Sequence, residues 1–406
     1  MKIIKGGVTT PKGFLASGVK AGIKKSGNPD LALLYSEVPA VAVASFTKNR
    51  FQASPVKISR GHLKHKTHQA IIVNSGNANC ANGIIGDKDA AAMTELAAKP
   101  LLLAKKEVLV ASTGIIGHYL PMKKIEAAIP ELIGDLSGSK GSVFAKTIMT
   151  TDTVKKELAI SLKLGADTVL IGGSCKGVGM LYPDMKTDKH ATMLCFISTD
   201  VSITKKMLAE SLDEAIKDSF NMVSVDGDMS TNDSCFVLAN GLAGNRRIES
   251  KGSSYNKFTE SLKFLCKELA KKLAADGEGA TKFVEIIVTG AKNIEAARII
   301  ARKISTSSLL KCAICGEDPN WGRVVAAAGA CGIDFDPDKV DVYLGNVKAM
   351  SNGQSIKNFD KEKARKLFQK KDVYITVDLK SGKSRATAWT CDFTKEYVAI
   401  NSEYST

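Results

Sequence analysis

The sequence Ala191-Thr192-Met193-Leu194-Cys195-Phe196-Ile197 places a hydroxyl residue directly before a run of apolar side chains. A short apolar run bounded by polar residues predicts a buried β-strand, here over residues 193–197. A glycine-rich segment with one lysine precedes it, Gly172-Gly173-Ser174-Cys175-Lys176-Gly177-Val178-Gly179-Met180. Such a segment is typical of backbone-mediated recognition rather than core packing, because glycine lets a ligand approach the main chain closely.

Further apolar runs predict strands over residues 70–73, 108–111, 169–171 and 284–288. Apolar residues at helical spacing predict two helices, one through Leu208, Leu212, Ile216 and Phe220 and one from Phe258 to Leu273. Ser202 is the expected N-cap of the first helix, and Gly277 is expected to end the second. After a boundary near residue 280, a second set follows, with a helix near residues 294–304 and strands near 340–344 and 373–379. The sequence therefore predicts a mixed α/β protein in two parts.

Composition favours a soluble cytoplasmic protein. Lys and Arg outnumber Asp and Glu by 57 to 42 in the 406 residues, for a formal charge of +15. This excess favours anionic partners. Because it is spread along the chain and aromatic residues are only 6%, we expect no nucleic-acid partner. No apolar stretch is long enough to predict a membrane span.

Cysteine and histidine patterns do not predict a metal site. The nine cysteines are an odd number scattered over a large chain, which indicates reduced thiols that are mostly buried. Cys312 and Cys315 have the spacing of a metal-binding pair but lack a second pair, so we expect a structural role. His62, His65 and His68 recur every three residues, which favours a solvated helix face.

Two polar segments follow predicted strands, at residues 74–79 and 112–117. In the second, the hydroxyl of Thr113 and the N–H of Gly114 could converge on a developing oxyanion, although a helix cap is an equal alternative. The phosphate-loop pattern GxxxxGK[ST] is absent from the sequence.

Taken together, these segments resemble the ornithine acetyltransferases, also called glutamate N-acetyltransferases, of arginine biosynthesis. The resemblance extends over nearly the whole chain. The segments that carry it are residues 74–79, 112–117, 149–153, 172–180, 190–194, 226–233, 276–282, 316–323 and 401–406.

The resemblance implies a four-layer α-β-β-α sandwich over residues 1–280, a smaller α/β domain over 281–390, and a C-terminal tail over 391–406 that returns to the active site. It also implies self-cleavage between Ala191 and Thr192, giving an α chain of residues 1–191 and a β chain of residues 192–406. The two chains are expected to stay associated and to assemble as paired αβ units.

By the same resemblance, Thr192 is the catalytic nucleophile. It takes the acetyl group of N-acetylornithine and passes it to glutamate in a ping-pong reaction, while Thr113 and Gly114 stabilise the oxyanion. An N-terminal threonine carries its own base, since the reference pKa of an α-amine lies near 8. The implied substrate contacts are Thr150 or Thr151, Lys176, Thr192, Glu278, Asn401 and Thr406.

Several questions stay open at this level. No cofactor is expected, but acetyl-CoA could serve as a second acetyl donor. Residues 186–190 are an addition to the family pattern just before the scissile bond, with an undetermined effect on cleavage. The alternative functions are an aminopeptidase of related fold, which passes the acyl group to water, and a non-catalytic basic binding protein.

Overall fold

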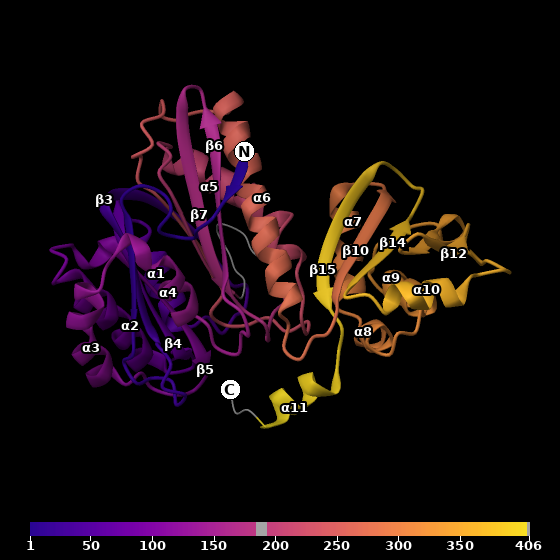
Figure 1. Cartoon of the computed structure of the whole chain (residues 1–406), viewed down its shortest axis with the longest axis horizontal. Coiled ribbons are helices and arrows are strands. Elements are labelled where there is room, and N and C mark those ends of the chain that lie inside the picture. Colours follow the sequence, from indigo (N-terminus) through magenta and orange to yellow (C-terminus); the bar gives the residue numbers. More distant parts are fainter. Residues whose placement is uncertain (184–192, 404–406) are drawn as a thin grey trace.

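The computed structural model describes residues 1–183 and 193–403. Two sheets and the helices that cover them form a mixed α/β structure (Figure 1). The strands of the first sheet are β1 (Lys2–Ile4), β2 (Phe14–Val19), β3 (Leu31–Phe46), β4 (His68–Asn77), β5 (Val108–Ile115), β6 (Lys156–Leu164), β7 (Asp167–Lys176), β8 (Leu194–Thr199) and β9 (Ser234–Ala239). Its helices are α1 (Ser54–His62), α2 (Gly83–Ala98), α3 (Met122–Gly134), α4 (Gly141–Thr147), α5 (Lys205–Lys217) and α6 (Ser253–Ala275).

The first sheet folds back on itself at β3. The first half of β3 pairs with β2 and β4, and its second half pairs with β9, with a register shift between Tyr35 and Ala40. Strand order is β1-β6-β7-β8-β9-β3-β4-β5, with β2 beside β3. We call β2, the first half of β3, β4 and β5 leaf B, and the remaining strands leaf A.

Apolar side chains fill the space between the two leaves. Ile71 and Leu109 of leaf B belong to one buried cluster with Phe196 and Phe236 of leaf A, whose rings stack at 5.7 Å. Helices α2 and α3 cover the outer face of leaf B, and α5 and α6 cover that of leaf A. The layers are therefore helix, leaf B, leaf A, helix, which confirms the predicted α-β-β-α sandwich.

The predicted helix through Leu208 is confirmed as α5, except that it ends at Lys217 and Phe220 begins a separate 3₁₀ turn. The predicted N-cap is wrong. The hydroxyl of Thr204 accepts a hydrogen bond from the N–H of Met207 and caps the helix. Ser202 cannot do so, because its carbonyl pairs with the N–H of Ile248 while the chain is still extended. The second helix ends at Ala275, just before Gly277, as expected.

A second sheet lies beside the sandwich. Its strand order is β13-β12-β11-β14-β10-β15, in which β10 runs parallel to β14 and antiparallel to β15. The elements are β10 (Phe283–Ala291), α7 (Ile294–Ser305), α8 (Ser308–Cys315), α9 (Trp321–Gly329), β11 (Asp341–Leu344), β12 (Val347–Ser351), β13 (Gln354–Ser355), α10 (Lys361–Phe368), β14 (Asp372–Asp378) and β15 (Ser384–Cys391), followed by α11 (Lys395–Glu403).

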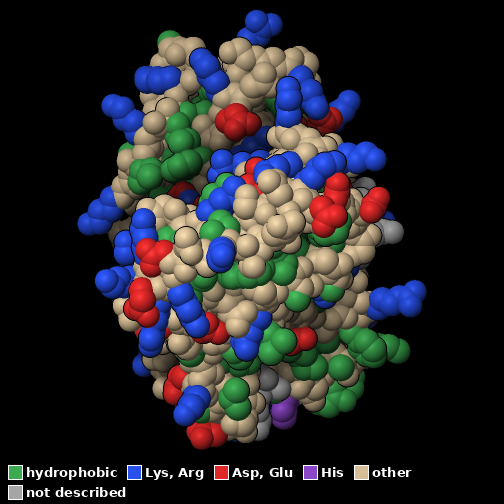
Figure 2. Space-filling model, turned by 90° about the vertical axis from the view of Figure 1, so that its right-hand side faces the viewer, with side chains coloured by type: hydrophobic (Ala, Val, Ile, Leu, Met, Phe, Trp, Pro, Cys, Tyr) green, Lys and Arg blue, Asp and Glu red, His purple; other side chains and the backbone are tan. Residues whose placement is uncertain are grey.

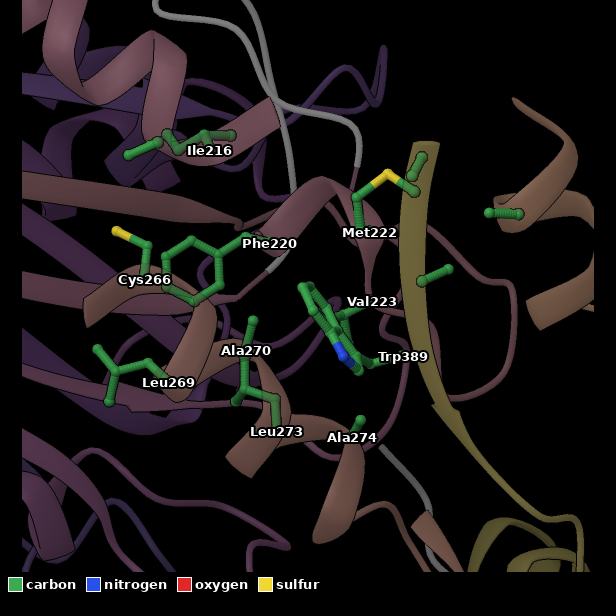
Figure 3. Close-up of a cluster of buried hydrophobic side chains, with 14 of the residues drawn as sticks. Ile216, Phe220, Met222, Val223, Cys266, Leu269, Ala270, Leu273, Ala274 and Trp389 are labelled. Carbon is green, nitrogen blue, oxygen red and sulfur yellow. The ribbon is translucent and has the colours of Figure 1, made fainter. Parts of the chain in front are cut away.

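The contact between the sandwich and the second sheet is apolar. Trp389 of β15 packs toward Val223, Ala270 and Leu273 (Figure 3). Its carbonyl accepts a hydrogen bond from the N–H of Ser224 at 3.0 Å. Because α6 is held in this contact, the turn that follows it is fixed relative to both parts of the molecule.

The histidine prediction is wrong. His62 ends α1 and His68 lies in β4, so these residues do not share one helix, and both are buried rather than solvated. The ring of His62 contacts the carbonyl of Val108 at 2.7 Å, and that of His68 contacts the carbonyl of His62 at 2.9 Å. Burial lowers the pKa of His68 to about 4, because the charged ring would lose its hydration.

Most of the cysteines are free and buried, as predicted, but Cys312 is exposed and Cys315 partly exposed. Within residues 1–183 and 193–403, no cluster of three His, Cys, Asp or Glu side chains is arranged to hold a metal ion. Helices with the length and apolar character needed to cross a membrane are likewise absent from these residues. On the face in Figure 2, Lys and Arg are scattered among acidic and apolar side chains.

Candidate active site

One pocket at the end of the sandwich collects most of the predicted site residues. Thr113, Gly114, Thr150, Thr151, Lys176, Glu278 and Asn401 all line it. Ala191, Thr192 and Thr406 lie outside the described residues. Met193, which follows Thr192 in the chain, also lines the pocket. The pocket therefore lies at the N-terminal end of β8. It is lined by segments from both leaves, by the turn after α6 and by the C-terminal tail.

The Thr113-Gly114 pair lies at the end of β5, within the strand rather than in a loop after it. There Ser75 pairs with Thr113 and Gly76 with Gly114 in the parallel register of β4 and β5. Gly114 has a φ of 133°, and a Cβ at this position would lie 2.3 Å from the carbonyl carbon of Gly76. Only glycine fits here. The helix-cap alternative is wrong because both residues lie within β5 and the next helix, α3, begins only at Met122.

Asn232 joins the two leaves at the pocket. Its side-chain amide donates to the carbonyl of Ala78 at 2.5 Å and to that of Ser112 at 2.9 Å. Its own oxygen accepts from the hydroxyl of Thr231 at 2.6 Å. This buried amide fixes the end of β5 relative to β9. Asn232 lies in the segment 226–233, which carries part of the family resemblance. The sequence pattern alone does not predict that its amide contacts Ala78 and Ser112.

Lys176 ends β7 and points its ammonium group at two hydroxyls. Its Nζ donates to the Oγ1 of Thr150 at 2.6 Å and to that of Thr113 at 3.3 Å. The residue is 7% exposed, which excludes the solvated alternative. Burial lowers its pKa, although the nearby carboxylate of Asp152 opposes this shift. Lys176 therefore links Thr113, the candidate oxyanion donor, to Thr150.

Behind Lys176 lies a buried ion triad, which we call the Lys156 triad, of Asp152, Lys156 and Asp276. Nζ of Lys156 donates to Asp152 at 2.7 Å and to Asp276 at 2.5 Å, and it is 1% exposed. Asp152 also accepts from the N–H groups of Thr150 at 3.1 Å and Gly177 at 3.0 Å. Although burial raises the pKa of Asp152, the two lysines bring it below its ordinary value.

The Lys156 triad thus connects the three segments that carry Thr150, Lys176 and Glu278. Asp276 accepts from the backbone N–H and the hydroxyl of Thr153, and it begins the turn that carries Glu278. Asp152 and Asp276 lie in segments that carry the resemblance and Lys156 lies outside them, and the sequence alone gives no signal that these three charges meet.

Glu278 faces Lys176 across the pocket and is held by two side chains. Its Oε1 accepts from the hydroxyl of Thr151 at 2.6 Å, and its Oε2 accepts from the amide of Asn401 at 2.9 Å. A Cβ at Gly179 would lie 2.3 Å from Oε2, so the glycine-rich segment leaves room for this carboxylate. Thr150 and Thr151 therefore have different partners, Lys176 and Glu278 respectively.

The C-terminal tail reaches the pocket through α11. Gly279 has a φ of 64°, and a Cβ there would lie 2.6 Å from the backbone nitrogen of Tyr397, so glycine permits the close approach. The hydroxyl of Thr394 donates to the carbonyl of Gly279 at 2.7 Å, and the Phe393 and Tyr397 rings stack at 4.7 Å. These contacts bring Asn401 beside Glu278.

The pocket pairs a buried ammonium with a buried carboxylate and is also lined by the Thr113-Gly114 pair. A ligand with an amino-acid end finds partners of both signs there, and a developing oxyanion finds donors. These features, on an α-β-β-α sandwich, define an enzyme of the acyltransferase class.

The comparisons with known proteins give the family. The model of the ArgJ family matches residues 15–406. The arginine biosynthesis bifunctional protein ArgJ of Dehalococcoides mccartyi is 46% identical over 403 residues, covering 99% of this chain and 98% of that protein. The protein of the same name from Symbiobacterium thermophilum is 46% identical over 408 residues and covers both chains fully. The chain belongs to the ArgJ family, and it is an acyltransferase of arginine biosynthesis.

Solved structures in the comparison align with part of the chain. The Bacillus halodurans arginine biosynthesis bifunctional protein argJ is 37% identical with a TM-score of 0.49, covering 51% of this chain and 97% of that one. The ornithine acetyltransferase of Mycobacterium tuberculosis, complexed with ornithine, is 38% identical with a TM-score of 0.41, covering 45% and 98%.

Proposed function

We propose that this enzyme transfers the acetyl group of N-acetylornithine to glutamate through an acetyl-Thr192 intermediate, after cleaving its own chain between Ala191 and Thr192. The observation that carries the proposal is the meeting of Thr113, Gly114, Lys176 and Glu278 at Met193, the residue that follows Thr192. Family membership supports the same activity.

Cleavage and transfer use the same hydroxyl. In the precursor, the Thr192 hydroxyl attacks the Ala191 carbonyl, the C–N bond breaks, and water hydrolyses the resulting ester. The products are the carboxyl group of Ala191 and the amine of Thr192. This amine is the base that a threonine hydroxyl needs in order to act as a nucleophile near neutral pH.

The transfer then runs in two half-reactions. The amine takes the hydroxyl proton as the Thr192 oxygen attacks the acetyl carbon, and the proton passes to the departing nitrogen of ornithine. Glutamate next attacks the acetyl-Thr192 ester through its amine, and a proton returns to the threonine oxygen. Thr113 and the N–H of Gly114 stabilise the oxyanion in both steps, and the kinetics are ping-pong.

Charge complementarity supports these substrates. Both are α-amino-acid derivatives of about the same length that carry an α-carboxylate, and N-acetylornithine also carries a side-chain ammonium group. Lys176 is the partner of a carboxylate, and Glu278 with Asn401 is the partner of an ammonium group. Either Thr150 or Thr151 contacts the substrate. Thr406 is a further proposed substrate contact.

Acetyl-CoA is the second donor in this proposal, without any bound cofactor. The names of the relatives call them bifunctional, and direct acetylation of glutamate by acetyl-CoA would be a second activity at the same Thr192. We further propose that the two chains assemble as paired αβ units. The mass of the purified protein in solution, set against the mass of one αβ pair, tests this assembly.

An acetyl-transfer assay tests the activity directly. Purified protein should convert N-acetylornithine and glutamate to ornithine and N-acetylglutamate, and the acetyl group should be found on Thr192 when glutamate is omitted. Replacing N-acetylornithine by acetyl-CoA tests the second donor. Release of acetate without glutamate acetylation would instead support the aminopeptidase-like alternative, in which water is the acceptor. Absence of glutamate acetylation with either donor would contradict the proposed reaction.

A further inference from the structure

Lys311 is a buried lysine that the proposed reaction does not use. It lies on α8 and is 1% exposed. Its ammonium group donates to the hydroxyl of Thr390 at 2.8 Å and to the carbonyl of Cys391, and the Sγ of Cys391 lies 3.5 Å away. None of these partners is a carboxylate. An ammonium group buried against neutral groups is costly, because it loses its hydration without gaining an opposite charge. Its position therefore calls for a functional reason.

The same ammonium group lies over the ring of Phe393, 4.5 Å from the ring centre. A cation in this position is attracted by the π electrons of the ring. The N–H of Phe393 also donates to the carbonyl of Lys311 at 3.3 Å. Thr390 and Cys391 end β15, and Phe393 follows them, so these contacts fall where the C-terminal tail leaves the second sheet (Figure 1).

Direct contacts lead from Phe393 along the tail to Glu278. The Phe393 ring stacks on that of Tyr397, with 4.7 Å between the ring centres. The carbonyl of Tyr397 accepts from the side-chain amide of Asn401 at 3.0 Å, and the same amide donates to Oε2 of Glu278 at 2.9 Å. Because α11 has no buried residue of its own, these few contacts determine where Asn401 lies.

The neighbouring residue Asp392 anchors the start of the tail to the turn after α6. It is 1% exposed, and its Oδ1 accepts from the N–H groups of Thr281 and Lys282, both at 2.9 Å. The tail is thus anchored on two sides, to the turn by Asp392 and to α8 by Lys311. Hydrogen bonds from a charged donor are about twice as strong as those between neutral groups, so a buried ammonium group makes the second anchor firmer than an uncharged side chain would.

We infer that Lys311 is a positioning residue for substrate binding: it directs the C-terminal tail so that Asn401 holds Glu278 in place for the ammonium group of N-acetylornithine. The inference rests on the proposed function, because that function assigns the substrate ammonium to Glu278. Lys311 does not line the pocket, so it acts through the tail and not on the substrate.

A double-mutant cycle tests whether Lys311 acts through Asn401. The variants are Lys311→Met, Asn401→Ala and the two combined, each read by kcat and KM for N-acetylornithine. Each single change should raise KM by about fivefold, the factor that one ordinary hydrogen bond corresponds to, with little change in kcat. If Lys311 acts through Asn401, the combined variant should be no worse than the more impaired single variant. Factors that multiply, as they do for independent sites, would overturn the inference.

Lys348→Met is the matched control, because it removes a similar set of lysine contacts from the second sheet. Lys348 pairs with Asp341 at 2.7 Å and lies over the ring of Tyr343 at 5.5 Å. This variant should keep the wild-type KM, and the effect of Asn401→Ala should be the same with and without it. A rise in KM as large as that of Lys311→Met would show a general disturbance of the second sheet and overturn the inference.

The inference and the proposed function fail in different ways. If wild type transfers acetyl groups from N-acetylornithine but Lys311→Met keeps the wild-type KM, the inference alone is overturned. A wild-type protein that does not transfer acetyl groups from N-acetylornithine would overturn both.

A second measurement depends neither on catalysis nor on Lys311→Met folding. Phe393→Leu removes the ring and leaves Lys311 its hydrogen bonds to Thr390 and Cys391, so the variant should fold. Amide hydrogen exchange over residues 395–403 should be faster than in wild type in Phe393→Leu and in Lys311→Met, and unchanged in Lys348→Met. Wild-type exchange of this segment in Phe393→Leu would contradict the role of the Lys311–Phe393 contact in holding the tail.

Discussion

The two sides of the pocket are built differently. On one side, Lys176 and Thr150 are supported by the Lys156 triad, whose charges are paired and buried. On the other side, α11 has no buried residue and presents Asn401 through one hydrogen bond to Glu278. Paired buried charges allow one arrangement, because any displacement leaves a charge unsatisfied. The difference indicates that the triad side holds the reacting groups in place, whereas the tail completes the pocket around a substrate.

Breaking the triad should have the largest effect. Lys156→Met leaves Asp276 buried without its cation and Asp152 with only Lys176, at 3.9 Å. Removing one partner of a buried ion pair costs about 3–5 kcal/mol. Urea denaturation should show this loss of stability. The control is Lys140→Met, whose partner Asp135 lies at a surface where both side chains are about one third exposed. It should cost at most about 1 kcal/mol, and similar losses in both variants would contradict the assigned role of the triad.

The Thr113 hydroxyl on the same side should act in the chemical step. Thr113→Ala removes an oxyanion donor, which typically costs about 10²-fold to 10³-fold in rate. Single-turnover acetylation of Thr192, measured with N-acetylornithine, is the appropriate assay. Stability should change little, since this hydroxyl has one long contact with Lys176. A wild-type single-turnover rate would show that Thr113 is not an oxyanion donor.

Glu278 lies where the two sides meet, and its charge should matter for binding. Glu278→Gln keeps the shape but removes the charge opposite a substrate ammonium, and a hydrogen bond to a charged group is worth about 1.5–3 kcal/mol. We expect a lower kcat/KM for N-acetylornithine, by roughly tenfold to a hundredfold, with cleavage still complete by intact mass. An unchanged kcat/KM would rule out this assignment.

The tail should give the smallest effect. Asn401→Ala removes one hydrogen bond to Glu278, worth about 1 kcal/mol, so KM should rise several-fold with little change in the urea midpoint. Ser402→Ala is the neighbouring control, because the Ser402 hydroxyl donates to the carbonyl of Ala399 within α11. If Asn401→Ala destabilised the fold as strongly as Lys156→Met, the contrast between the two sides would be wrong.

Strands at residues 70–73 and 108–111 were predicted well because they are short apolar runs with strong local signals, whereas the sandwich that they build was implied only by the family resemblance. The sequence located Lys176 and Glu278 because their segments resemble a family with a known pattern. The sequence-based prediction was wrong where tertiary contacts determine which side chains are buried, as for His68, which is buried in β4. The Lys156 triad was also missed, since three-dimensional proximity of charges distant in sequence has no local signature.

The proposed mechanism requires Thr192 to become the first residue of a second chain. Intact-mass spectrometry of freshly purified wild-type protein, beside the Thr192→Ala variant, measures whether the chain is cut there. Wild type should give two masses, corresponding to residues 1–191 and 192–406, and the variant should give a single inactive chain. Thr192→Ser retains a hydroxyl and should still cut. A single uncut wild-type chain that nevertheless transfers acetyl groups would show that Thr192 is not an N-terminal nucleophile.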